Sequence, residues 1–289
     1  MLYVNSSIPA VETLRAEGLD VVVGQPAGVP RIGLLNLMPE KVATEYDYCR
    51  MLAQSGLMLS VVLLRLPGET YKTTPQSYVE AHYEVFDPDN APPALDGLIV
   101  TGAPLEQMPF EAVRYWERLC RIFDWSAQHV RSTLCICWAA QAALYHSYGL
   151  PKYALAEKCF GIFQQEVLLP GHPLLNELPS VFPMPHSRHT AVDFEDLPDR
   201  CLVLSAGLDT GVSLVVDETL RRVMVIGHLE YAADTLDREY RRDLARELPI
   251  QLPEHYYHND DPAQGVDFSW ATAAQTFYRN WAASLMSDD

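Results

Sequence analysis

The stretch Ser132-Thr-Leu-Cys-Ile-Cys137 passes directly into Trp138-Ala-Ala-Gln-Ala-Ala-Leu144, so an apolar run becomes a helical pattern without an intervening loop. A strand that turns at once into a helix places the residue at the turn, here Cys137, in strained backbone at the carboxyl edge of a sheet. The helix dipole stabilises a thiolate there, and the amide of Trp138 could bind an oxyanion. Cys137 is therefore a candidate nucleophile; the alternative is a buried cysteine with only a packing role.

Similar apolar runs alternate with helical patterns along the whole chain. They predict strands over residues 31–38, 59–66, 96–101, 132–137, 201–204, 213–216 and 223–227, and helices over 41–54, 110–127, 138–148, 234–247 and 267–286. This alternation is typical of βαβ units, so we expect an α/β fold with a mostly parallel sheet flanked by helices. The polar, tyrosine-rich segment 69–93 reads as a long excursion with one short helix.

The chain also lacks a Gly- or Ser-rich linker that would divide it. We therefore expect a single domain over residues 1–289, with the N-terminal segment 1–30 and the tail 248–289 packing on it.

Composition excludes several classes of protein. The 21 Lys and Arg residues against 38 Asp and Glu give a formal net charge of −17, which argues against partners that are nucleic acids or anionic membranes. Apolar residues make up 48% of the chain, enough to exclude a disordered protein. No apolar run reaches the roughly 18 residues of a membrane span, and the first residues lack a signal-peptide pattern. Six scattered cysteines indicate free thiols in a reducing, cytoplasmic compartment.

Two other motifs follow predicted strands. In Gly227-His-Leu-Glu-Tyr231, His228 and Glu230 are two residues apart and could face the same side. A histidine there could deprotonate a thiol or hydroxyl while the carboxylate orients the imidazole; the alternative is an exposed His beside an exposed Glu. Gly102-Ala-Pro-Leu105 could offer backbone amides, including that of Leu105, to an oxyanion, or could be a plain βα turn.

Two His-x-x-His spacings, 186–189 and 255–258, raise the question of a metal. Neither lies on a clear helix or carries the adjacent Glu of zinc proteases, so we expect no metal site.

The order Cys, then His-x-Glu, with each residue at a strand end, resembles the homoserine O-acyltransferase family of methionine biosynthesis. The similarity covers nearly the whole chain and includes Ile8-Pro-Ala-Val11, Leu14-Arg15, Asn36-Leu-Met-Pro39, Lys41, Asp96-Gly-Leu-Ile-Val-Thr-Gly-Ala-Pro-Leu105, Tyr115-Trp116, Asp124-Trp-Ser126, Cys137-Trp-Ala139, Gln141-Ala142, Tyr148-Gly149, Pro151-Lys152, Glu157-Lys158, Pro185-His-Ser-Arg188, Gly227-His228, Glu230-Tyr231 and His258-Asn-Asp260. The resemblance implies a class I glutamine-amidotransferase-like fold, which is a flavodoxin-like three-layer architecture, with added excursions.

The resemblance also implies roles for particular residues. Cys137 would accept the acyl group from acyl-CoA as a thioester, and His228 and Glu230 would act as base and orienting carboxylate in a ping-pong mechanism. The residues that match the family's acceptor site are Lys158, Ser187 and Arg242. Both cations suit a substrate carboxylate. Acyl-CoA would be a co-substrate, with no permanently bound cofactor, and we expect a homodimer.

The chain departs from the family pattern at two places. Leu229 stands where proline is more usual, and Glu40 stands before Lys41 where the family has a second basic residue. The second departure leaves Lys41 as a possible site residue without its basic neighbour.

Glu106 follows the Thr-Gly-Ala-Pro-Leu segment at the position that sorts acyl donors in the family, where Gly accompanies succinyl and Glu accompanies acetyl. A carboxylate there would repel the terminal carboxylate of a succinyl group. We therefore expect a homoserine O-acetyltransferase.

Several alternatives stay open at this stage. The donor could be succinyl-CoA, or the acceptor could be L-serine, which is one methylene shorter. A glutamine amidotransferase is disfavoured because Cys137 lacks flanking glycines, and a non-catalytic binding protein is disfavoured by the intact triad.

Overall fold

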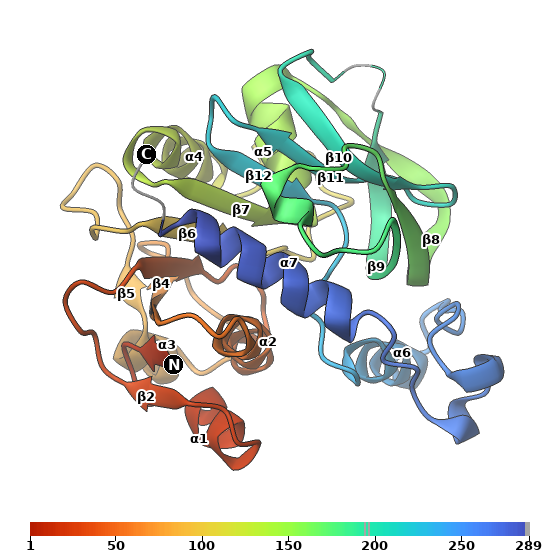
Figure 1. Cartoon of the computed structure of the whole chain (residues 1–289), viewed down its shortest axis with the longest axis horizontal. Helices are drawn as coiled ribbons and strands as arrows, with labels where there is room; N and C mark the ends of the chain where they lie inside the picture. The colour runs from red at the N-terminus through yellow and green to blue at the C-terminus, as the bar shows by residue number, and fades with distance from the viewer. Residues whose placement is uncertain (194, 196, 287–289) are drawn as a thin grey trace.

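The structure, a computed structural model, describes residues 1–193, 195 and 197–286 (Figure 1). The strands of this described part form one twelve-stranded sheet in the order β2-β1-β4-β3-β6-β7-β12-β11-β10-β8-β9, with β5 beside β4. The strands are β1 (Leu2–Val4), β2 (Val21–Val23), β3 (Arg31–Leu35), β4 (Leu59–Arg65), β5 (Glu84–Val85), β6 (Gly97–Val100), β7 (Ser132–Ile136), β8 (Lys152–Val167), β9 (Val181–Val192), β10 (Cys201–Gly207), β11 (Gly211–Asp217) and β12 (Arg222–Val225).

Helices cover both faces of this sheet. The α-helices are α1 (Pro9–Ala16), α2 (Lys41–Gln54), α3 (Gln76–His82), α4 (Trp116–His129), α5 (Trp138–Tyr148), α6 (Thr235–Ala245) and α7 (Ala271–Ser284), and short 3-10 turns lie at η1 (Phe110–Ala112), η2 (Pro173–Leu175), η3 (His258–Asp260) and η4 (Pro262–Gln264). The prediction of an α/β fold with a mostly parallel sheet flanked by helices is confirmed.

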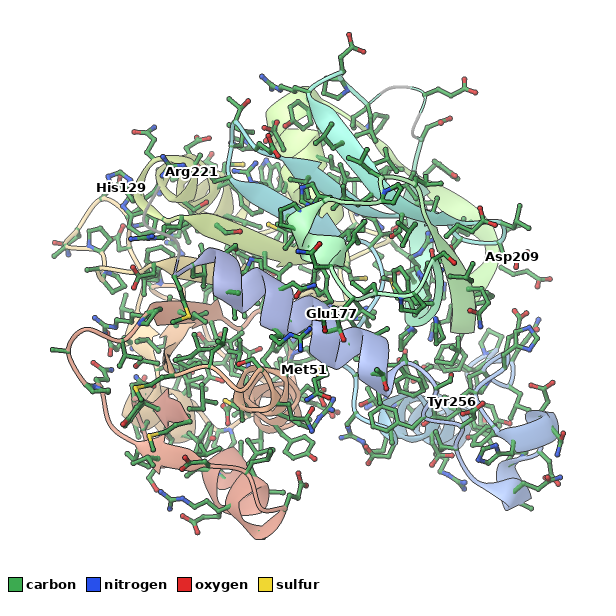
Figure 2. The ribbon with its side chains drawn as sticks, in the orientation of Figure 1. Met51, His129, Glu177, Asp209, Arg221 and Tyr256 are labelled. Carbon is green, nitrogen blue, oxygen red and sulfur yellow. The ribbon has the colours of Figure 1, made fainter. Side chains whose placement is uncertain are left out.

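Successive side chains of a strand point to opposite faces of the sheet, so the buried apolar residues form two clusters, one on each face. In β7, Leu134 and Ile136 belong to the cluster that contains α1, α2 and α7, whereas Cys135 belongs to the cluster under α4 and α5. Figure 2 shows the packed side chains, with the buried Met51 of α2 beside α7, a helix that α2 contacts. Both faces of β7 are thus buried, which explains why its sequence is a continuous apolar run.

The predicted elements are present with small shifts, except in three regions. The predicted helix 110–127 divides into η1 and α4, because the backbone at Val113 is extended. The long antiparallel pair β8 and β9 and the short strands β1 and β2 were not predicted. The outer part of β8 alternates poorly because residues 155–158 form a bulge between Ala154 and Cys159.

The parallel part of the sheet determines where the loops with candidate site residues meet. Strands β3, β6, β7 and β12 are consecutive neighbours and run parallel, with Val100 opposite Cys135 and Ile136 opposite Val225. The carboxyl ends of parallel strands lie at one edge, so the segments that follow these four strands come together there.

Within the described residues, no helix is both long and apolar enough to span a membrane. All six cysteines are unpaired thiols.

Candidate active site

Cys137 lies at a sharp turn between β7 and α5. Its backbone has φ 49° and ψ −112°, a conformation that costs a non-glycine residue about 1–3 kcal/mol. The neighbouring structure holds it there: its amide donates to the carbonyl of Val225 (2.7 Å), and its carbonyl accepts from the amide of Gln141 (3.1 Å). The turn predicted from the sequence is therefore present.

His228 and Glu230 follow β12 and lie beside Cys137. Nδ1 of His228 is 2.7 Å from Oε1 of Glu230, and the imidazole also forms a hydrogen bond with Cys137. The three residues are 3–4% exposed. Burial alone would lower the pKa of His228, but the charges of Cys137 and Glu230 and the hydrogen bonds to them outweigh burial and raise that pKa well above its usual value.

The turn that carries His228 and Glu230 is held by groups from distant segments. Arg50 Nη2 donates to the carbonyl of Glu230 (2.9 Å), and the amide of Ala232 donates to Oδ1 of Asp47 (3.2 Å). Sequence reasoning missed Asp47 and Arg50. The local signal is weak, because Asp47 and Arg50 are two of four charged residues in α2, with Lys41 and Glu45.

A cavity of about 730 Å³ opens over these side chains. Its wall contains every member of the predicted acceptor site as well as Cys137 and His228; the lining residues are Met38, Pro39, Gly102, Ala103, Pro104, Leu105, Glu106, Gln107, Met108, Pro109, Cys137, Lys158, Ser187, His189, His228, Tyr231, Glu239, Arg242 and Asp243. Strands β8 and β9 supply Lys158 and Ser187, and α6 supplies Arg242. This space is called the central cavity below.

The acceptor-site residues converge on one carboxylate that the sequence analysis did not single out. Oε1 of Glu239 accepts from Lys158 Nζ (2.8 Å) and from Ser187 Oγ (2.9 Å), and it lies 3.6 Å from Nη2 of Arg242. Arg242 also makes a two-pronged contact with Asp243, at 2.7 and 3.0 Å. The patch thus holds two cations, Lys158 and Arg242, and two carboxylates, Glu239 and Asp243. This balance of charge suits a zwitterionic ligand such as an amino acid better than a simple anion. The spacing of Glu239, three residues before Arg242 on one helix, could have signalled it.

Glu106 lies directly above the thiol. Its Oε1 is 3.9 Å from Sγ of Cys137, and its Oε2 accepts from the amide of His189 (2.5 Å). Burial raises the pKa of Glu106, although the His189 amide and nearby positive groups oppose this shift.

The two predicted oxyanion donors differ in their present bonding. The amide of Leu105 already donates to the carbonyl of Ala103 (2.8 Å). In the described structure, by contrast, no protein acceptor is within hydrogen-bonding distance of the amide of Trp138. Trp138 therefore has the freer amide.

Lys41 does not reach the central cavity. Its Nζ donates to the carbonyls of Asn36 (2.7 Å) and Met38 (3.2 Å) and lies 4.5 Å from the centre of the Tyr71 ring. Burial lowers the pKa of Lys41 to about 8 although Glu45 opposes this shift. Its position favours a role in supporting the loop after β3.

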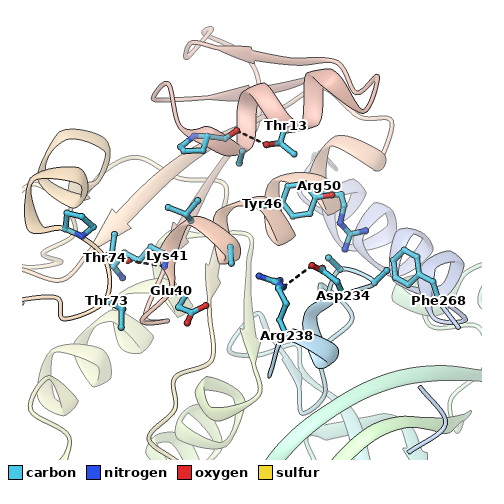
Figure 3. A pocket seen from close by; sticks show the side chains of 17 residues that line it. Thr13, Glu40, Lys41, Tyr46, Arg50, Thr73, Thr74, Asp234, Arg238 and Phe268 are labelled. Atoms are coloured by element: carbon cyan, nitrogen blue, oxygen red, sulfur yellow. Dashed lines mark hydrogen bonds and ion pairs between the residues drawn. The ribbon is translucent and has the colours of Figure 1, made fainter. Parts of the chain in front are cut away.

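A second cavity of about 730 Å³ lies between α1, α2 and the residues at the start of α6 (Figure 3). Figure 3 shows Arg238 facing Asp234, with which it forms an ion pair (3.0 Å), while Arg50 lies beside Phe268.

Among the described residues, no cluster of three or more His, Cys, Asp or Glu side chains could hold a metal.

Comparison with solved structures shows the fold. A glutamine amidotransferase from Thermotoga maritima matches with a TM-score of 0.61 at 14% identity, over 91% of this chain and all of that one. A glutamine amido transferase from Methylobacillus flagellatus gives a TM-score of 0.56 at 13% identity, over 89% and 94% of the two chains.

Comparison of sequences shows the family. Residues 1–288 match the family model described as homoserine O-succinyltransferase. Proteins named homoserine O-acetyltransferase from Bacteroides fragilis (strain ATCC 25285) and Geobacillus kaustophilus are each 45% identical over 282 residues, which is 95% of this chain and 92% or 93% of theirs. Both the length of these matches and their identity leave one conclusion: the chain belongs to the homoserine O-acyltransferase family.

Proposed function

We propose that the protein is a homoserine O-acetyltransferase of methionine biosynthesis, which transfers acetyl from acetyl-CoA to the hydroxyl of L-homoserine. One observation supports this most directly: Cys137 and His228 line the same cavity as Glu106 and as a charge-balanced patch that suits an amino acid. The patch consists of Lys158, Arg242, Glu239 and Asp243. The similar proteins named homoserine O-acetyltransferase agree with it.

In the first half-reaction, the proton of the Cys137 thiol lies on His228, and the thiolate attacks the thioester carbonyl of acetyl-CoA. The raised pKa of His228 favours this imidazolium–thiolate pair, and Glu230 stabilises the imidazolium. The amide of Trp138 binds the developing oxyanion at the start of α5. When the tetrahedral intermediate collapses, the carbon–sulfur bond to CoA breaks, CoA takes the proton from His228, and acetyl remains on Cys137.

In the second half-reaction, L-homoserine occupies the charge-balanced patch. Its carboxylate replaces Glu239 as the partner of Lys158 and Arg242, and its ammonium group pairs with Glu239. His228 then removes the proton of the substrate hydroxyl, whose oxygen attacks the acetyl-cysteine and restores the thiolate. The product leaves as O-acetyl-L-homoserine.

The position of Glu106 favours acetyl over succinyl. Its carboxylate lies 3.9 Å from the sulfur, in the space that an acyl chain longer than acetyl would enter. A succinyl carboxylate there would meet a like charge at short range.

A crossed assay tests the proposal. The protein is incubated with acetyl-CoA or succinyl-CoA, each with L-homoserine or L-serine, and CoA release is followed. We expect the highest kcat/KM with acetyl-CoA and L-homoserine. Release with succinyl-CoA as the preferred donor would overturn the acetyl assignment, and ammonia release from glutamine alone would place the chain with the amidotransferases.

A variant tests the covalent step. With acetyl-CoA alone, the intact protein should gain the mass of one acetyl group, whereas Cys137→Ala should gain none and lose turnover by several orders of magnitude. Cys120→Ser, a partly exposed cysteine of α4, is the matched control and should behave like the wild type. Full activity in Cys137→Ala would exclude this mechanism.

A further inference from the structure

A cleft of about 250 Å³ adjoins the central cavity and has no role in the chemistry described so far. Its lining comes from the loop after β3, the excursion after β4, the loop after β6 and the residues before α4; these are Asn36, Leu37, Met38, Pro39, Lys41, Leu66, Glu69, Thr70, Tyr71, Lys72, Thr73, Ala103, Pro104, Leu105, Arg114 and Tyr115. We call it the side cleft. It shares Met38, Pro39 and the 103–105 loop with the central cavity, so the two spaces meet at the loop beside Cys137.

The side cleft carries positive charge in a strongly acidic protein. Three cations line it, Lys41, Lys72 and Arg114, against one carboxylate, Glu69. Glu69 is itself paired with Arg114 and also lies 3.4 Å from Arg118 Nη1. Lys72 is exposed and forms no ion pair with any described residue. Its charge is available at the rim.

The distribution of lysine in the whole chain singles out the same region. The sequence has only four lysines, at positions 41, 72, 152 and 158. Lys41 and Lys72 line the side cleft, Lys158 lines the central cavity, and Lys152 lines a cavity that adjoins the central one at the 106–109 loop. The four lysines of a chain with net charge −17 therefore line three adjoining cavities, the central one of which contains Cys137, so that positive charge is gathered near the site as a polyanionic substrate requires.

The neighbouring cavities suit a polyanion less well. The one lined by Lys152 also contains Glu106 and Glu111, and Lys152 Nζ already donates to the carbonyl of Met108 (2.6 Å). In the cavity of Figure 3, Arg238 is paired with Asp234, and Arg50 donates to the carbonyl of Glu230. The side cleft has the greatest excess of positive charge among these spaces.

The walls of the side cleft fit the chemistry of a pantetheine arm. Leu37, Leu66 and Leu105 supply apolar surface, and the rings of Tyr71 and Tyr115 supply flat amphipathic surface. We propose that the side cleft binds the CoA arm of the donor: pantetheine lies along these walls, and the phosphates meet Lys72 and Arg114 at the rim. This inference rests on the proposed function, because a CoA thioester must present its carbonyl to Cys137.

The test compares two donors that differ only beyond the thioester. Acetyl-CoA carries the full arm, whereas S-acetyl-N-acetylcysteamine keeps only its cysteamine end and lacks the rest of the pantetheine, the phosphates and the nucleotide. Lys72→Glu should raise the KM for acetyl-CoA by about three- to tenfold, as expected for reversing one exposed ion pair, and should leave the kinetics with the truncated donor and the KM for L-homoserine unchanged. Lys72→Gln should give a smaller effect, and higher salt should weaken acetyl-CoA binding more in the wild type than in Lys72→Glu.

Lys152→Glu is the matched variant on the other side of the central cavity. An acetyl-CoA-specific loss in Lys152→Glu but not in Lys72→Glu would overturn the proposal and place the arm there. Equal KM values for acetyl-CoA in Lys72→Glu and the wild type would overturn it as well. Absence of turnover with every acyl-CoA in the wild type would instead contradict the proposed function, so the two failures are distinguishable.

Discussion

At the scale of single residues, the candidate site depends on side chains whose character comes from burial and close partners. Cys137 keeps an unfavourable backbone conformation because β12 accepts the hydrogen bond of its amide through Val225 and α5 donates to its carbonyl through Gln141. Gly102 leaves room beside it: a Cβ at Gly102 would lie 3.5 Å from Cβ of Cys137 and 3.8 Å from Cε1 of His228. The absence of a side chain at Gly102 thus keeps open the space where a thioester must approach.

Glu106 provides the first prediction at this scale. Glu106→Gly should raise kcat/KM for succinyl-CoA relative to acetyl-CoA by at least tenfold, because it removes a buried carboxylate and opens space next to the sulfur. Glu106→Gln is the matched control: it removes the charge and keeps the size, so it should shift the ratio less. An unchanged donor ratio in both variants would show that Glu106 does not contact the acyl group.

At the scale of elements, α2 connects the loop after β3 with the turn after β12. Its first residue, Lys41, donates to the carbonyls of Asn36 and Met38, and its second and third turns place Asp47 and Arg50 against the backbone of residues 230–232. One rigid helix thereby positions two of the loops that line the central cavity. Helix α5 holds the third of these segments, the turn after β7, because the amide of Gln141 donates to the carbonyl of Cys137.

Asp47 gives a prediction about stability. Burial, with a contribution from Glu230, raises the pKa of Asp47 from 3.8 to about 8. The folded protein therefore binds more protons than the unfolded chain between about pH 4 and pH 8, and the free energy of unfolding should fall as pH rises through this range, by at most about 1.4 kcal/mol per pH unit.

Asp47→Asn keeps an oxygen for the amide of Ala232 and cannot ionise. The difference in unfolding free energy between this variant and the wild type, measured by urea denaturation, should grow in favour of the variant from pH 5 to pH 8. Asp20→Asn, at an exposed carboxylate, should show no such trend. A pH-independent difference for Asp47→Asn would contradict the buried ionisation.

At the scale of the whole molecule, the two halves of the sheet contribute different parts of the site. The parallel half supplies Cys137, His228 and Glu230, and the antiparallel pair β8 and β9 supplies Lys158 and Ser187 (Figure 1). The segment after α6 contacts both β8 and the start of α6, and so links the strands that carry Lys158 and Ser187 to the helix that carries Arg242. Glu254 pairs with β8 at Gly161, and the hydroxyl of Tyr256 donates to the carbonyl of Ala233 beside the start of α6.

Gly161 tests this connection. A Cβ there would lie 2.4 Å from the carbonyl oxygen of Glu254 and 2.5 Å from its nitrogen, and φ is +148°. Gly161→Ala should therefore lower the melting temperature, by roughly 2–4 °C for each kcal/mol lost, and raise the KM for L-homoserine because Lys158 moves with β8. In the control Gly171→Ala, at φ +95°, the new methyl meets nothing within 4 Å. Equal melting temperatures for the two variants would mean that the tail does not press on Gly161.

The sequence by itself determined the parallel part of the fold and indicated the candidate site residues at its edge. Apolar runs followed by helical patterns identify β3, β4, β6 and β7, and the residues directly after β7 and β12 include Cys137 and the His228–Glu230 pair, whereas Glu106 is singled out by the family resemblance. These features are local in the chain, because a buried parallel strand and the turn that follows it are marked by neighbouring residues.

Only the tertiary structure decided what depends on pairing between distant segments. The β8–β9 pair, the contact of Glu239 with Lys158 and Ser187, and the support of Glu230 by Arg50 across 180 positions leave no periodic signal. The side cleft likewise needs four segments to meet. The net charge of this acidic, lysine-poor sequence argues against polyanionic partners. Only the folded structure shows that its four lysines line three adjoining cavities at the candidate site, because local charge is set by which residues the chain brings together.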